Sequence, residues 1–290
     1  MFKLGIITDE VYQDFEEALK FAKEYGLECV ELRSAWEKNP FQYSEEDFSK
    51  IADLLKKYKM PLVCISSPMF KCSCFDEEAK KEHIEGLKRL IAQSDKLGFK
   101  MIRCFDFINE DGLTLDLIKK AFKEPIALCE KAGITLVLES EPSANSSDCK
   151  RTAETVKYIN SPTVKALYEP GNNIYSDTDE IPYPDGYNAV KDVFCHVHIK
   201  DAIEENGITT GVRIGDGAVD YKGMIKEFIT SEYNGAVIFE PHYKPGLVMS
   251  EELLRNPQGS QISAMGDIAS KECILSLNEI INHIKKEIEL

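Results

Sequence analysis

The 290-residue sequence predicts a single-domain α/β protein of the (β/α)₈ type, the TIM barrel. Short β-branched runs alternate with amphipathic helical runs, and the pair repeats roughly every 30 to 35 residues, as strand–helix units do. Eight such units can be traced across residues 1–290. A doubly wound open sheet is not favoured, because IITDE (residues 6–10) follows the first predicted strand in place of a G-x-G-x-x-G turn.

The predicted strands are runs of β-branched and apolar residues between turn signals. In chain order they are expected at 4–7, 27–33, 61–66, 100–105, 134–139, 164–169, 193–200 and 235–240. Active sites of TIM barrels lie at the carboxyl ends of the strands. The catalytic and ligand-binding residues of this chain are therefore expected among the residues that end these runs.

Apolar residues at helical spacing predict helices between the strands. Ser44 is expected to cap one helix, Gly98 and Gly133 to end two others, and Pro125 to kink a long one. The helices are expected at 15–25, 43–58, 77–97, 114–132, 148–159, 187–191, 221–228 and 268–288. The last is expected to pack on the barrel. Residues 211–220 are expected to be a glycine-rich loop, and the segment before the last helix a loop or a short helix.

The composition and charge of the chain limit the kinds of molecule that it is expected to bind. The net charge of −15 and pI near 4.9 argue against a nucleic-acid partner, because phosphate backbones need a basic surface. No apolar stretch approaches the roughly 20 residues of a membrane helix. The first residues do not resemble a signal peptide, so we expect a cytoplasmic protein whose nine cysteines are reduced. The sequence is compatible with a homo-oligomer. The segment 242–266 could cap the pocket of its own chain or that of a neighbouring subunit.

Four predicted strands carry a metal-binding residue near their carboxyl ends, and they are consecutive in the chain. These residues are Glu139, Glu169, His198 and Glu240. Neighbouring strands lie about 4.8 Å apart, so the side chains should converge, and three close carboxylates either protonate or recruit a cation. The set predicts one divalent ion, with Mn²⁺, Mg²⁺, Co²⁺ and Zn²⁺ all compatible. Taken singly, each glutamate could instead be a helix cap or a surface ion-pair partner.

Seven short motifs, in their order and spacing over residues 3–245, resemble the xylose isomerase-like TIM barrels. Within that family the chain resembles the sugar phosphate isomerase/epimerase branch, with its ketose 3-epimerases and inosose isomerases and dehydratases. The motifs are TDE (8–10), VELR (30–33), LVLES (136–140), EPGN (169–172), HVHIKD (196–201), RIGDG (213–217) and FEPH (239–242). The resemblance implies the same four metal ligands, with one departure: the family usually has Asp where this chain has Glu169.

The resemblance also implies substrate-binding residues. Arg213 matches an arginine that grips a substrate oxygen or anion, and Asn172 matches a position that carries Asn or His in relatives. Lys200 either polarises a substrate hydroxyl or pairs with Asp201. His196 shares a face with His198 but lies one pleat repeat deeper, so it supports the site from below or binds directly. The implied substrate is a small sugar, sugar phosphate or keto-inositol.

The strand-end residues and the resemblance together predict a divalent-metal-dependent isomerase or epimerase of carbohydrate metabolism. Glu139 and Glu240 are the expected catalytic pair, because their strands flank the site and a carboxylate must remove the proton beside a metal-bound carbonyl. A dehydratase shares this first step and stays an alternative. A non-catalytic metal- or sugar-binding barrel is the second alternative, because of Glu169. Endonucleases with this barrel need three metals and more histidines than the five found here.

Overall fold

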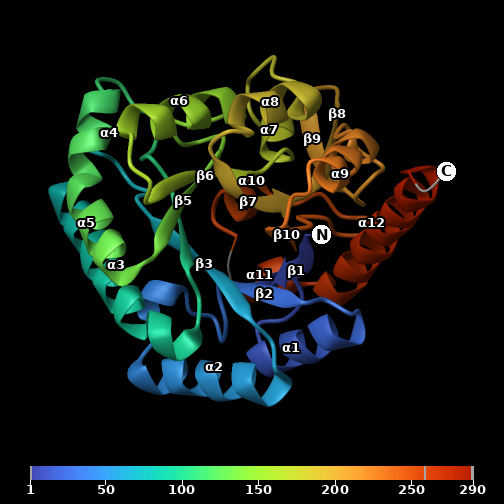
Figure 1. Cartoon of the computed structure of the whole chain (residues 1–290), viewed down its shortest axis with the longest axis horizontal. Coiled ribbons are helices and arrows are strands. Elements are labelled where there is room, and N and C mark those ends of the chain that lie inside the picture. Colours follow the sequence, from blue (N-terminus) through green and yellow to red (C-terminus); the bar gives the residue numbers. More distant parts are fainter. Residues whose placement is uncertain (1, 258, 289–290) are drawn as a thin grey trace.

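The computed structural model describes residues 2–257 and 259–288, and its centre is a closed barrel of eight parallel strands (Figure 1). The strand order around the barrel is β1-β10-β7-β6-β5-β4-β3-β2. The predicted (β/α)₈ architecture is thus confirmed. The barrel strands are β1 (Lys3–Ile7), β2 (Cys29–Leu32), β3 (Leu62–Met69), β4 (Met101–Cys104), β5 (Thr135–Glu139), β6 (Val164–Tyr168), β7 (Phe194–Ile199) and β10 (Ala236–Phe239).

Helices surround the barrel, and α12 packs against α9 and β10 (Figure 1). The long ones are α1 (Phe15–Glu24), α2 (Glu45–Tyr58), α3 (Glu77–Leu97), α5 (Lys123–Ala132), α6 (Cys149–Ile159), α9 (Tyr221–Thr230) and α12 (Gly266–Ile288). The short ones are η1 (Thr8–Glu10), η2 (Pro40–Gln42), α4 (Leu115–Ala121), α7 (Asn172–Tyr175), η3 (Pro182–Gly186), α8 (Tyr187–Val190), α10 (Glu251–Arg255) and α11 (Gly259–Ser263). No helix of the described residues is long and apolar enough to cross a bilayer.

Local signals explain where the helices begin and end. Ser44 caps α2, since its side chain accepts from the N–H of Asp47 and Asp47 accepts in return. Gly98 ends α3 with φ of 82°, a conformation that costs glycine little. The helix predicted over 114–132 is instead two helices that meet at Phe122. Pro125 explains this break, because it lacks an N–H and its ring clashes with the preceding turn.

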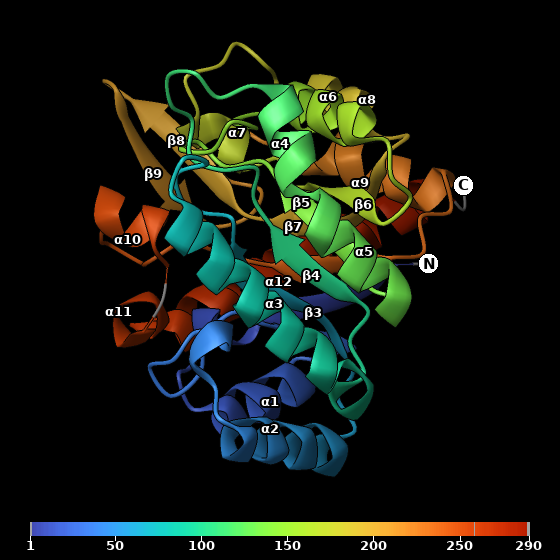
Figure 2. The same ribbon diagram turned by 90° about the vertical axis from the view of Figure 1, so that its left-hand side faces the viewer.

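Two further strands lie in a stretch where no element is predicted, and the second runs two residues into the predicted glycine-rich loop. Strands β8 (Asp201–Glu205) and β9 (Ile208–Val212) form an antiparallel hairpin. Its turn is Asn206-Gly207, and both residues have positive φ, as this kind of two-residue turn requires. The dipeptide followed by β-branched residues was the signal for this hairpin. Figure 2 shows it projecting from the same end of the barrel as α10 and α11.

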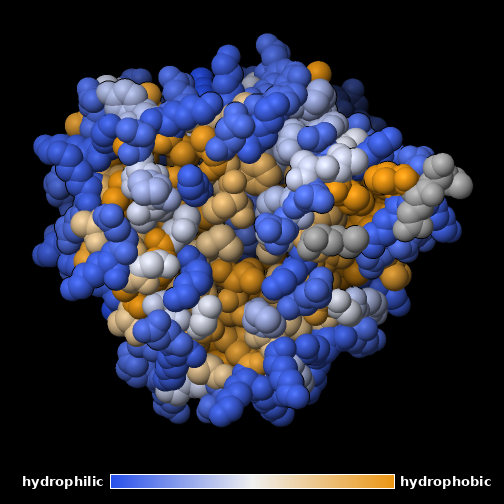
Figure 3. All heavy atoms as spheres, viewed as in Figure 1, coloured by the Kyte–Doolittle hydropathy of each residue, from blue (hydrophilic) through white to orange (hydrophobic). Residues whose placement is uncertain are grey.

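The two ends of the barrel differ. The view of Figure 3 faces the amino-terminal ends of the strands, where apolar side chains gather around the middle and hydrophilic ones around the rim. The hairpin, α10 and α11 all lie at the opposite, carboxyl-terminal end (Figure 2). The elements that could enclose a substrate are therefore at the end where the predicted ligands fall.

Candidate metal centre and pocket

The structure brings the four predicted ligands together. Glu139 ends β5, Glu169 follows β6, His198 lies in β7 and Glu240 follows β10. These four strands are consecutive around the barrel, so their ends meet at one side of the rim. One ligand atom of each residue lies within 4.8 Å of the others, and all four side chains are buried. The spacing suits a single ion held by three carboxylates and one imidazole.

The hydrogen bonding of His198 fits this use. Its Nε2 lies 3.1 Å from Glu31 Oε1, so a proton on Nε2 is donated to that carboxylate. Its Nδ1 has no hydrogen-bond partner among the described residues, and it faces Glu139 Oε1 at 3.3 Å and Glu240 Oε2 at 3.6 Å. A neutral imidazole in this tautomer presents a lone pair to the cluster, as a metal-binding histidine does.

Glu169, like His198, presents an atom without a hydrogen-bond partner that a metal ion could bind. Its Oε2 is buried without a hydrogen-bond partner in the described part of the chain. Burial raises the pKa of this carboxyl to about 8, and the neighbouring Glu240 adds to the effect. Glu240 behaves differently: although its burial acts in the other direction, Lys200 and His242 hold its pKa well below the usual range. The donor set therefore fits a divalent ion.

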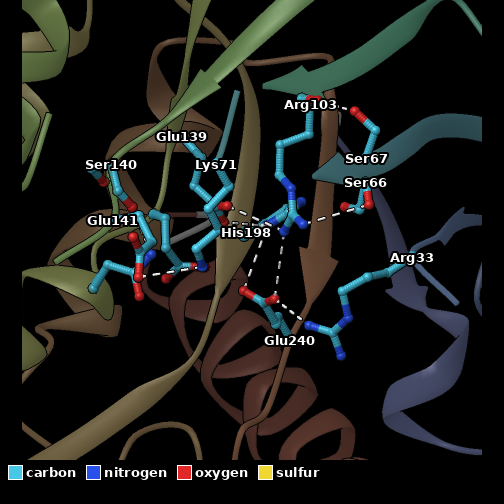
Figure 4. Close-up of polar contacts among 12 residues, drawn as sticks. Arg33, Ser66, Ser67, Lys71, Arg103, Glu139, Ser140, Glu141, His198 and Glu240 are labelled. Carbon is cyan, nitrogen blue, oxygen red and sulfur yellow. Dashed lines mark hydrogen bonds and ion pairs between the residues drawn. The ribbon is translucent and has the colours of Figure 1, made fainter. Parts of the chain in front are cut away.

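Three buried cations lie against the cluster, and Figure 4 shows two of them, Arg33 and Arg103. Arg103 Nη1 lies 3.1 Å from Glu139 Oε2. Lys200 Nζ lies 2.8 Å from Glu240 Oε2 and 3.6 Å from Glu169 Oε2. Arg33 Nη1 lies 2.6 Å from Glu240 Oε1. These ion pairs hold the carboxylates in place, and Glu240 also accepts hydrogen bonds from Arg33 and Lys200.

Glu31 connects two histidines beneath the cluster. Besides His198, it accepts from His196, whose Nε2 lies 2.6 Å from Glu31 Oε2. Ser66 also donates to Glu31. Strand β2 carries Glu31 and strand β7 carries the histidines, so this contact crosses the barrel interior. We infer that Glu31 orients the imidazole of His198, which makes it a positioning residue.

The variant Glu31→Gln should weaken metal binding, because glutamine cannot accept from both histidines as a carboxylate does. We expect the dissociation constant for Mn²⁺ or Zn²⁺ to rise by about 10- to 100-fold. Isothermal titration of the metal-free protein measures it. The matched control is Glu28→Gln, an exposed glutamate just before β2. Equal affinity in the two variants would show that Glu31 does not orient the ligand.

A cavity of about 730 Å³ lies at this end of the barrel. Glu139 and Glu240 line it, together with the predicted substrate-binding residues Asn172 and Lys200. One wall is the tip of the β8–β9 hairpin. The other contains residues 248–249 and 254–257 of the segment after β10. Residues 248–249 and 254–257 thus line the pocket of their own chain, one of the two arrangements expected for the segment.

Two predicted substrate-binding residues lie elsewhere. Arg213 is not among the residues that line the cavity: its guanidinium pairs with Asp216 at 2.9 Å and its side chain is 42% exposed. His196 is buried below the cluster against Glu31, so it supports the site and does not reach the cavity.

Asp201 holds the loop that follows Arg213. Its carboxylate accepts from the backbone N–H groups of Gly215, Gly217 and Val219, which ties the loop to the start of β8. Lys200 does not pair with Asp201: its ammonium points to Glu240 and Glu169.

Sequence reasoning missed several residues of the pocket. Arg103 is a lone charge in the short strand β4, and such a residue in an otherwise apolar run was the available signal. Lys71 and Tyr175 gave no comparable signal, because they lie in irregular or very short segments. Lys71 Nζ lies 3.4 Å from Glu141 Oε1 at the cavity wall.

Comparisons with known proteins agree with this architecture. The family described as xylose isomerase-like TIM barrel matches residues 19–261 of the chain. A crystal structure of the IOLI protein with a bound zinc atom has 15% sequence identity and a TM-score of 0.75, and the match covers 98% of this chain and 99% of that one. An L-ribulose 3-epimerase structure has 14% identity and a TM-score of 0.74, covering 100% and 97%.

A D-allulose 3-epimerase from Methylomonas sp., in complex with D-allulose, has 14% identity and a TM-score of 0.68, covering 93% of this chain and 95% of that one. No curated protein matches the sequence. At such identities, likeness to solved structures shows the fold alone.

Proposed function

Because the chain belongs to the xylose isomerase-like TIM-barrel family, we propose that it is a divalent-metal-dependent isomerase or epimerase. Its substrate is a sugar, a sugar phosphate or a keto-inositol. One observation carries the proposal: Glu139, Glu169, His198 and Glu240 converge where the barrel strands end, and two of them line a sugar-sized cavity. The solved L-ribulose and D-allulose 3-epimerases with this fold support it.

A divalent ion bound to these four residues would supply a Lewis acid that makes a C–H beside a substrate carbonyl more acidic. The residues of the chain would do the rest. Glu139 and Glu240 both line the cavity, on strands β5 and β10, and each can hold a proton at a carboxylate oxygen. Return of the proton to the opposite face gives epimerisation, and its return to the neighbouring carbon gives isomerisation.

Lys200 and Asn172 would position the substrate. Lys200 Nζ keeps Glu240 in place while its ammonium lines the cavity. Asn172 Nδ2 donates to the carbonyl of Ser140 at 2.6 Å, which sets the orientation of the amide and leaves its oxygen to accept from a substrate hydroxyl. Both residues are nearly fully buried, so little freedom is lost when a substrate binds.

Deuterium exchange tests the proposal. Protein loaded with Mn²⁺ is incubated in D₂O with a panel of ketoses, keto-inositols and their phosphates, and incorporation is read by mass spectrometry. We expect one or more compounds to gain deuterium next to the carbonyl, and we expect EDTA to stop the exchange. Formation of a conjugated enone would identify a dehydratase. Lack of exchange across the whole panel would refute the proposal.

A further inference from the structure

Tyr175 is a pocket residue with no role in the proposed reaction. It ends the short helix α7, one turn after Asn172, and it lines the cavity. Its hydroxyl is buried, and it has no hydrogen-bond partner among the described residues. Burial raises the pKa of Tyr175 to about 12, so the hydroxyl keeps its proton and can donate at neutral pH.

Other buried tyrosines near the site have partners. Tyr168 donates to the carbonyl of Pro182 at 2.7 Å, and Tyr221 donates to the carbonyl of Lys200 at 2.7 Å. Native proteins rarely leave such a group unpaired, because an unmade hydrogen bond in a buried place is costly. An unpaired hydroxyl at the wall of a cavity is therefore one that a bound molecule can satisfy.

Glycine at position 211 preserves the space beside this hydroxyl. A Cβ at Gly211 would lie 3.2 Å from Tyr175 Oη and 2.1 Å from the carbonyl oxygen of His242. A side chain there would push strand β9 away from both groups. Strand β9 thus passes close to the Tyr175 hydroxyl without supplying a hydrogen-bond partner for it.

The charged side chains that line the pocket already pair with other groups, although Arg103 Nε has no hydrogen-bond partner among the described residues. Arg33, Arg103 and Lys71 pair with carboxylates, as described above, and Lys200 lies between Glu169 and Glu240. Arg255 also has a partner. A phosphate would have to compete with these carboxylates for each cation. The Tyr175 hydroxyl adds an uncharged donor that competes with no carboxylate, which suits a neutral polyhydroxy compound.

We propose that Tyr175 is a specificity-determining residue whose hydroxyl donates a hydrogen bond to a hydroxyl or carbonyl oxygen of an uncharged polyhydroxy substrate. This inference rests on the proposed function, because it needs a sugar-like molecule in the cavity. It adds a contact from a residue outside the four-residue cluster. The contact is made in the ground state and in the transition state alike, so it acts on binding.

The variant Tyr175→Phe tests the inference on whichever neutral compound the wild-type protein exchanges. We expect KM to rise about tenfold with kcat nearly unchanged, the effect of losing one hydrogen bond that is made throughout the reaction. Deoxy analogues of the compound locate the contacted oxygen: the analogue that lacks it should be handled equally by both proteins. If KM is unchanged, or if kcat carries the whole loss, Tyr175 does not have this role.

The matched control is Tyr43→Phe, which removes another buried tyrosine hydroxyl that does not line the cavity. It should leave KM unchanged. Thermal unfolding without substrate separates a binding role from a structural one: Tyr175→Phe should unfold at or above the wild-type temperature, since its hydroxyl has no partner to lose. A clearly lower temperature would overturn the inference. If the wild-type protein exchanges no compound at all, the proposed function is wrong. If the wild-type protein exchanges a compound but Tyr175→Phe does not raise KM, only the inference about Tyr175 is wrong.

Discussion

The variant Glu139→Gln should lose deuterium exchange by a factor of about 10³ or more, because glutamine cannot accept the proton that the carboxylate removes. Its amide oxygen can still face the ion, so the variant should retain metal. Arg103 Nη1, which lies 3.1 Å from Glu139 Oε2, can still donate to that amide. The measurement is the exchange rate at saturating substrate, together with metal content by mass spectrometry.

The comparison variant is Glu141→Gln, two residues further along the chain. Glu141 also lines the cavity, but it accepts from Ser143 and lies outside the four-residue cluster. Its exchange rate should fall by less than about tenfold. Similar losses in both variants would mean that the charge of the pocket matters and that Glu139 is not the base. Full exchange in Glu139→Gln would remove it from the mechanism.

The variant Arg33→Leu should lower the free energy of unfolding by about 3–5 kcal/mol, because it leaves buried carboxylates without their cation. Arg33 contacts Asp9 at 3.1 Å, Glu240 at 2.6 Å and Glu10, and all four side chains are buried. Urea unfolding of the metal-free protein in EDTA measures the change without a contribution from bound metal.

Arg213→Leu is the matched control for this prediction. Arg213 makes a bidentate pair with Asp216, but the pair is exposed, and such pairs contribute under about 1 kcal/mol. We expect unfolding of this variant to be nearly unchanged. A loss in Arg33→Leu no greater than that in Arg213→Leu would show that the carboxylates at the rim take up protons or rearrange at little cost.

Much of the site could be predicted from the sequence because barrel geometry is regular. A carboxylate that ends a strand must lie at one rim of the barrel, so Glu139, Glu169 and Glu240 could be placed together from three separate runs. Capping residues likewise allowed the ends of helices to be predicted. Helix α3 begins and ends where predicted, since Asp76 caps its start and Gly98 its end.

Contacts between distant segments could not be predicted. Arg33 and Glu240 are 207 residues apart in the chain, and Glu31 and His196 are 165 apart. No periodicity in the sequence relates them. Strands β2 and β7 meet only through side chains that cross the barrel, so the partner of each buried charge depends on how the interior packs.

The sequence by itself determined the (β/α)₈ class, the order of the elements and the four residues that converge, because each depends on local pattern and on the shared direction of parallel strands. The tertiary structure alone decided that Arg213 pairs with Asp216 and does not line the cavity, that residues 248–249 and 254–257 line the pocket of their own chain, and that Tyr175 keeps an unpaired hydroxyl. These depend on which side chains already have partners, and that is settled only when the whole barrel closes.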